Sequence, residues 1–64
     1  MDLIEIGKQI RAKRKELNVD QITFAAMSHI GVAALGRLER GTGNPRFQVL
    51  HRVLQTAGLE ITVK

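Results

Sequence analysis

The chain has 64 residues, and a domain of this length buries only about 60% of the surface that its unfolded chain exposes. Small folds are usually reinforced by disulfides, a metal or a second subunit, and the absence of cysteine excludes disulfide and thiolate-metal frameworks. The two histidines and six acidic residues show no metal-like spacing, so we expect no metal, no cofactor and reinforcement by a partner subunit. Ten basic against six acidic side chains give a net charge of +4, which favours an acidic partner such as nucleic acid.

The distribution of apolar residues predicts a soluble, cytoplasmic protein with no membrane partner. No apolar stretch approaches the ~20 residues that span a bilayer, and no signal-peptide pattern is visible. Repeats, low-complexity tracts and linkers are absent from the sequence, so residues 1–64 are expected to form a single domain.

The first predicted helix covers residues 3–17. Asp2 followed by Glu5 is a capping-box-like start, and Asn18 is a suitable left-handed stop. The apolar stripe at helical spacing consists of Leu3, Ile6, Ile10 and Leu17.

Two short helices are predicted next, over residues 21–28 and 32–40. Asp20 is the N-cap candidate for the first of them, and Gly31 for the second. The side chains expected to face the core are Phe24, Ala25, Met27, Leu35 and Leu38.

A fourth helix is predicted over residues 45–57. Asn44 and Pro45 read as its N-cap and first residue, and Gly58 is the expected stop. Its apolar stripe is Phe47, Leu50, Val53, Leu54 and Ala57.

Residues 59–63 alternate strictly between apolar and polar side chains, which predicts a short strand. A lone strand leaves its backbone groups unpaired, so we expect it to pair with its own copy across a two-fold axis. The homodimer contacts would then come from Leu59, Ile61 and Val63. A frayed tail is the alternative interpretation.

Two short helices joined by a three-residue turn and preceded by a longer helix indicate a helix-turn-helix. Over residues 7–59 the sequence resembles the Xre/Cro-type helix-turn-helix family, which includes the lambdoid phage repressors. The residues that carry the resemblance are Lys15-Glu16-Leu17, Gln21, Phe24-Ala25, Ile30, Leu35, Leu38-Glu39-Arg40-Gly41 and Asn44-Pro45-Arg46-Phe47. It implies an all-α, four-helix, lambda-repressor-like fold. His29 stands where the family usually has glycine, in a turn that needs a positive φ.

The closing segment is similar to that of the HipB-like antitoxins. Val53-Leu54-Gln55-Thr56, then Gly58-Leu59 and the alternating tail, carry this narrower likeness. It implies an operator-binding dimer whose C-terminal strands pair, an autoregulated type II toxin–antitoxin operon and a kinase-type toxin partner.

The resemblance also implies which residues meet double-stranded DNA. In the recognition helix, Val32 and Ala33 could touch a thymine methyl group, and only Arg37 could offer a bidentate fork to guanine. Gln21, Arg40 and Arg46 match positions that contact the phosphate backbone. Arg14 and Glu39 match a structural pair that joins helix 3 to helix 1.

Two other classes of function are alternatives to a DNA-binding repressor. His29, His51 and Ser28 do not form a catalytic constellation, so no enzymatic activity is expected. A protein-interaction module with weak or no base readout is the alternative, because Ile22, Ala26, Val32 and Ala33 would form an exposed apolar patch in a segment without charge.

Overall fold

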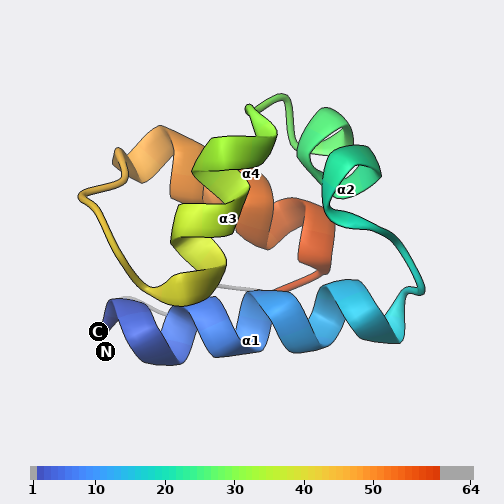
Figure 1. Ribbon diagram of the computed structural model, residues 1–64, viewed down its shortest axis with the longest axis horizontal. Coiled ribbons are helices and arrows are strands. Elements are labelled where there is room, and N and C mark those ends of the chain that lie inside the picture. The colour runs from blue at the N-terminus through green and yellow to red at the C-terminus, as the bar shows by residue number, and fades with distance from the viewer. Residues whose placement is uncertain (1, 60–64) are drawn as a thin grey trace.

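A computed structural model describes residues 2–59, and all of the regular structure in that part of the chain is helical (Figure 1). The helices are α1 (Leu3–Glu16), α2 (Gln21–Met27), α3 (Val32–Arg40) and α4 (Phe47–Ala57). The predicted all-α, four-helix architecture is therefore confirmed. Of the strand predicted over 59–63, only the first residue, Leu59, lies within the described residues.

Side chains and left-handed residues set most of the helix ends, as predicted. Asp2 Oδ1 accepts a hydrogen bond from the Glu5 amide at 2.8 Å, and Asp20 Oδ1 accepts one from the Thr23 amide at 2.7 Å. After α1 the chain turns through Asn18 (φ 59°), and after α4 through Gly58 (φ 74°). Helices α1 and α2 each end one residue earlier than predicted, with Leu17 and Ser28 as their C-caps.

The start of α4 differs from the prediction. Residues 44–46 are not helical, and the N-cap is Arg46 (φ −70°, ψ 147°), which makes no side-chain capping bond. The first intrahelical bond runs from the Leu50 amide to the Arg46 carbonyl. The assignment of Asn44 and Pro45 as N-cap and first residue was wrong because the extended backbone continues through Arg46.

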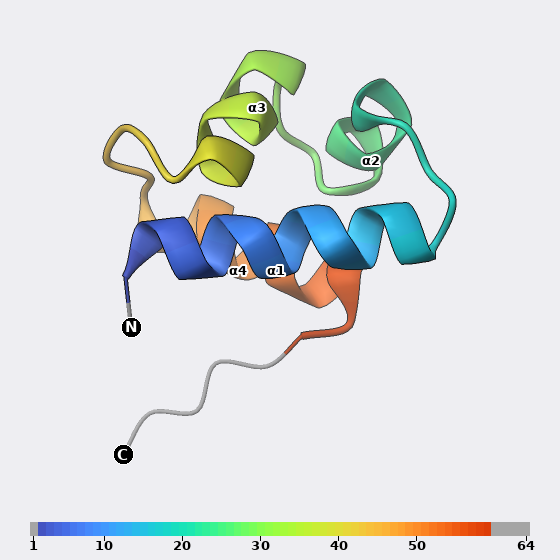
Figure 2. The same ribbon diagram turned by 60° about the horizontal axis from the view of Figure 1, so that its bottom comes forward.

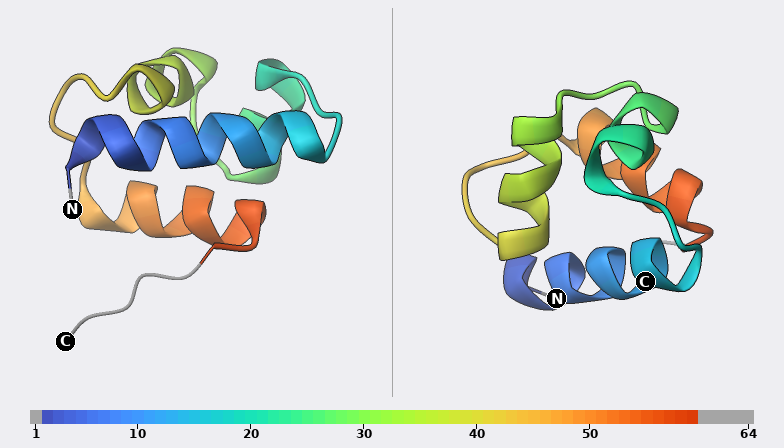
Figure 3. Two further views of the ribbon diagram at one scale, coloured as in Figure 1. Left: turned by 90° about the horizontal axis from the view of Figure 1, so that it is seen from below. Right: turned by 45° about the vertical axis from the view of Figure 1, so that its right-hand side comes forward.

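The core lies where α1 meets α3 and α4 and where α2 meets the same two helices. In Figure 2 and the left view of Figure 3, α2 and α3 lie to one side of α1 and α4 lies to the other. Gly7 makes the α1–α3 crossing close, since a β-carbon there would stand 2.3 Å from the Leu38 carbonyl oxygen. The buried apolar residues are Ile10, Phe24, Ala25, Leu35, Leu38, Val53, Leu54 and Ala57.

Three residues assigned to apolar stripes are exposed. Leu17 is the C-cap residue of α1, directly after the last helical residue, and its side chain is exposed. Met27 is the last residue of α2 and is exposed, whereas the next residue, Ser28, is buried. Phe47 is 66% exposed in the first turn of α4, with its ring stacked on His51 at 5.8 Å. Their placement as core residues was wrong because each lies at the end of its helix.

No helix among the described residues is long and apolar enough to cross a membrane.

Candidate nucleic-acid interface

Helix α3 has one buried face and one exposed face. Its core side consists of Leu35, Leu38 and Glu39, which are buried. The opposite side carries Val32, Ala33, Arg37 and Arg40, all exposed. We call this exposed side of α3 the ridge. Its side chains at the N-terminal end of the helix are apolar, and the two arginines follow about one and two turns later.

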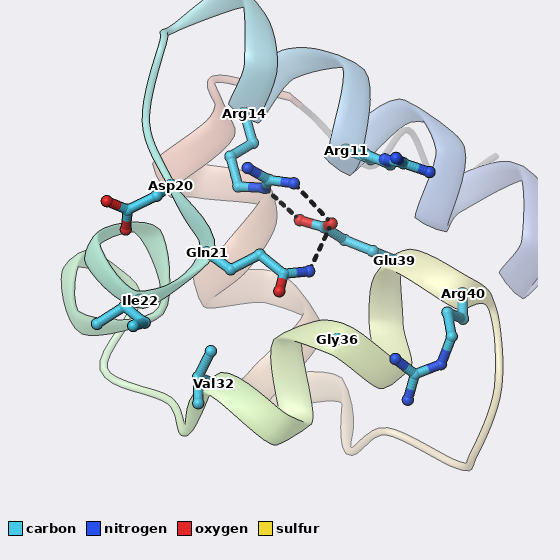
Figure 4. Close-up of a pocket in the computed structure, with 9 residues that line it drawn as sticks. All are labelled: Arg11, Arg14, Asp20, Gln21, Ile22, Val32, Gly36, Glu39 and Arg40. Carbon is cyan, nitrogen blue, oxygen red and sulfur yellow. Dashed lines mark hydrogen bonds and ion pairs between the residues drawn. The ribbon is translucent and has the colours of Figure 1, made fainter.

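A cavity of about 650 Å³ lies on one side of the ridge, between α3, α2 and the C-terminal half of α1 (Figure 4). We call it the α1–α3 hollow. Arg11 and Arg40, both exposed, contribute charged side chains to it from two helices. Its complete lining is Arg11, Arg14, Asp20, Gln21, Ile22, Val32, Gly36, Glu39 and Arg40.

A second cavity, of about 270 Å³, lies on the other side of the ridge, between α3 and the segment that leads into α4. We call it the loop hollow. Arg37 of α3 and Arg46 at the N-cap of α4 both line it, together with Pro45 and Val49. Each hollow is therefore lined by two exposed arginines that come from different elements.

A buried ion pair fixes α3 to α1 at the base of the α1–α3 hollow. Arg14 Nε donates to Glu39 Oε2 at 2.6 Å, and Arg14 Nη2 donates to Glu39 Oε1 at 3.1 Å. The remaining Nη1 donates to the Val19 carbonyl at 2.9 Å, which ties the pair to the α1–α2 turn. Arg14 and Glu39 thus join α3 to α1 through two hydrogen bonds.

The pair keeps both groups charged. Burial alone would raise the pKa of Glu39, but hydrogen bonds from Arg14 and Gln21 and the charges of Arg14 and Arg11 outweigh it, so its pKa is lowered. The hydrogen bond to Glu39 raises the pKa of Arg14 above its ordinary value. Asp20 also has a lowered pKa, chiefly because it accepts a hydrogen bond from the Thr23 backbone.

Two of the residues predicted to contact phosphates have neighbours that the sequence did not reveal. Gln21 Nε2 donates to Glu39 Oε1 at 3.1 Å, so its amide also supports the buried pair. The guanidinium of Arg40 lies back over Gly36 in the same helix (Figure 4). Arg11 was absent from the predicted set, although its position one turn before Arg14 places it beside the pair.

The predicted dimer residues are described only in part. Leu59 packs against the chain's own core, and its amide donates to the Leu54 carbonyl at 2.8 Å. Ile61 and Val63 lie outside the described residues. Within residues 2–59, no group of three or more His, Asp or Glu side chains is placed to hold a metal ion.

Residues 28–31 connect α2 to α3. His29 adopts φ 58° there, as the sequence predicts for the residue in place of the usual glycine. A family model described as Helix-turn-helix (HTH_3) matches residues 10–63. A search of curated proteins gives no match. With the match covering most of the chain and the fold in agreement, the chain belongs to this helix-turn-helix family of DNA-binding transcription regulators.

Proposed function

We propose that this chain is a sequence-specific transcriptional repressor that places α3 in the major groove of duplex DNA. The observation that carries the proposal is the exposed α3 ridge between two arginine-lined hollows. The major groove admits an α-helix and is bordered on both sides by phosphates. A ridge with cationic side chains on either flank matches that arrangement in shape and charge.

The side chains divide into two groups by their chemistry. Arg37 is the base-reading candidate on the ridge, because a guanidinium can donate two hydrogen bonds to guanine. Val32 and Ala33 offer only apolar contact. We assign Arg40 and Arg46, which line one hollow each, to phosphate contacts, and their exposure supports this assignment. Gln21 retains its second amide hydrogen for the same purpose, since only one hydrogen bond to Glu39 is formed.

The homodimer, the autoregulation and the toxin partner are proposed from the sequence alone. The alternating segment 59–63 and the small size of the chain support a homodimer joined through Leu59, Ile61 and Val63. The resemblance to HipB-like antitoxins supports autoregulation, cytoplasmic action and a kinase-type toxin as protein partner. Deleting residues 60–64 should convert a dimer to a monomer in sedimentation experiments. A full-strength dimer after that deletion would contradict the strand-pairing assignment.

Titration of duplex DNA at several salt concentrations tests the proposed function. Log affinity should fall linearly with log salt, by about 0.9 for each phosphate neutralised. Arg37→Ala should weaken binding to a selected site more than to random duplex, because a bidentate base contact contributes about 1–3 kcal/mol. Arg52→Ala is the matched control, since this exposed arginine of α4 lines neither hollow.

A protein-interaction module remains the second candidate, favoured by the exposed apolar patch that includes Ile22 and Val32. If duplex DNA binds weakly and without salt dependence, this candidate replaces the first. A reporter driven by the chain's own promoter tests repression, and neutralisation of a kinase-type toxin encoded beside its gene tests the antitoxin role.

A further inference from the structure

Gln21 connects the buried Arg14–Glu39 pair to the α1–α3 hollow. It is the first residue of α2, and its half-buried side chain lines the hollow. Its Nε2 donates to Oε1 of Glu39 at 3.1 Å (Figure 4). This bond uses one of the amide hydrogens, and the same nitrogen carries a second hydrogen for a further acceptor.

The two ends of a glutamine amide have opposite hydrogen-bonding chemistry. The nitrogen only donates and the oxygen only accepts. A phosphate only accepts, so it is attracted by the nitrogen end and repelled by the oxygen end. The last torsion of a glutamine side chain is broad and roughly two-fold, so an unrestrained amide presents either end. A glutamine that contacts a phosphate therefore binds it more tightly when a neighbour fixes the orientation of its amide.

Glu39 provides this restraint for Gln21. An ionised carboxylate has no hydrogen to donate, so it can bind only the nitrogen end of the amide. The carboxylate is itself held by Arg14, whose Nε donates to Oε2 at 2.6 Å and whose Nη2 donates to Oε1 at 3.1 Å. Glu39 is only 9% exposed, and the charge of Arg14 balances its own, which limits repulsion of a phosphate in the hollow.

We propose that Glu39 is a positioning residue for DNA binding, which holds the nitrogen end of the Gln21 amide as a hydrogen-bond donor for a backbone phosphate. The buried pair then does more than join α3 to α1, because Arg14 orients the carboxylate and the carboxylate orients the amide. The exposed guanidinium groups of Arg11 and Arg40 line the same hollow and add positive charge there. The inference rests on the proposed function, in which Gln21 contacts a phosphate.

Gln21→Ala measures the contribution of the amide. Affinity for a duplex selected by this chain from a random pool should fall about tenfold per subunit, the effect of a hydrogen bond to a charged group. Glutamine carries no charge, so the slope of log affinity against log salt should stay the same. Gln55→Ala is the matched control and should not change the affinity, because this exposed residue of α4 lines neither hollow.

Glu39→Gln tests the positioning role. The new side chain has one oxygen in place of two, so Arg14 and Gln21 compete for it and the Gln21 amide can turn. Ordering a free side chain on binding lowers affinity about two- to tenfold, so in this background Gln21→Ala should cost about fivefold or less. If Glu39 is purely structural, Gln21→Ala will cost as much in this background as in the parent, which would overturn the inference. Glu16→Gln removes the same charge from the exposed end of α1 and should leave the full cost of Gln21→Ala intact.

The free parent protein provides a readout that does not depend on the folding of a Glu39 variant. By NMR, the side-chain amide hydrogens of Gln21 should exchange with solvent more slowly than those of exposed Gln55, because Gln21 is bound to a buried carboxylate. Addition of the selected duplex should shift the Gln21 amide signals and leave those of Gln55 in place. Equal exchange rates for the two amides would contradict the positioning role.

Failure of this inference is distinguishable from failure of the proposed function. If the parent binds duplex DNA in a salt-dependent manner and Gln21→Ala binds equally well, the inference is wrong and the DNA-binding function stands. If the folded parent shows no salt-dependent binding to duplex DNA, the proposed function itself is wrong, and the inference fails with it.

Discussion

The guanidinium group of Arg40 lies over Gly36, one turn earlier in α3, and a β-carbon at Gly36 would stand 3.2 Å from Nη1 of Arg40. Glycine inside a helix costs about 1 kcal/mol relative to alanine. The recognition helix accepts this cost at a residue that lines the α1–α3 hollow. The missing side chain leaves room for the arginine to lie along the helix instead of extending away from it.

Gly36→Ala should therefore stabilise the domain. The neighbour is the far end of an exposed, flexible side chain, which can move by a few tenths of an ångström at little cost. The gain should approach 1 kcal/mol, or about 4–8 °C in the melting temperature of a domain this small. Calorimetry or circular dichroism melting measures it. A lower melting temperature would show that Arg40 is held rigidly over Gly36.

Gly7→Ala should have the opposite effect although it is the same substitution in a helix. At Gly7 the new β-carbon would stand 2.3 Å from the Leu38 carbonyl oxygen and 2.8 Å from that of Glu39. These are backbone atoms, so α1 and α3 would have to separate, and overpacking of this kind costs about 1–3 kcal/mol. We expect a lower melting temperature in spite of the gain in helix propensity.

The two variants control for each other, because both exchange glycine for alanine in a helix and only the neighbouring atoms differ. Equal stabilisation by both substitutions would contradict the close crossing of α1 and α3 at Gly7.

The parts of this fold that the sequence predicted are those determined by neighbouring residues. Asp2 and Asp20 cap their helices, and Asn18 takes a left-handed conformation, because each depends on three or four adjacent residues. The family resemblance, in contrast, indicated the positive φ of His29. The Arg14–Glu39 pair spans 25 residues, and the family resemblance, not local pattern, indicated it.

The parts that the sequence did not predict depend on tertiary packing. Gly7 lies on the buried face of α1 four residues from Leu3 and three from Ile10, yet only the α3 backbone shows why it must be glycine. Phe47 follows the apolar stripe of α4, but its position in the first turn leaves it exposed. For the candidate site, the family resemblance indicated Arg37, Arg40 and Arg46, whereas their division between two hollows required the fold.

Glu39→Gln should make the domain less stable at neutral pH and less sensitive to acid. Because the pKa of Glu39 is lowered in the folded state, its stabilisation is fully present above the unfolded-state value, about 4.5. That stabilisation is lost as pH falls from there through the folded-state pKa. Removing one partner of a buried ion pair costs about 3–5 kcal/mol, so the variant should unfold at lower denaturant concentration at pH 7.

Denaturant unfolding at pH 7 and at pH 3 measures both effects. The difference between parent and variant should shrink at the lower pH, where the parent's Glu39 begins to bind a proton. Asp20, the other carboxyl with a lowered pKa, is present in both proteins and cancels in the comparison. A difference that stays constant over this pH range would show that the Glu39 charge does not contribute to stability.

Arg46→Ala should weaken binding to all duplex sequences alike while leaving the fold intact. Arg46 is exposed at the N-cap of α4, and its side chain makes no capping hydrogen bond. Its positive charge also opposes the helix dipole, because it lies at the N-terminus of α4. For both reasons its removal should not destabilise the domain. Its side chain lines the loop hollow beside Arg37, where one flank of the groove would place a phosphate. A phosphate contact carries no sequence information, so specific and random duplexes should lose similar affinity. The slope of log affinity against log salt should become shallower by about 0.9 per subunit, close to 2 for a dimer.

Arg52→Ala, which removes the same charge from a part of α4 outside both hollows, should change that slope much less. Equal slopes for the two variants would mean that Arg46 acts only through the overall charge of the protein.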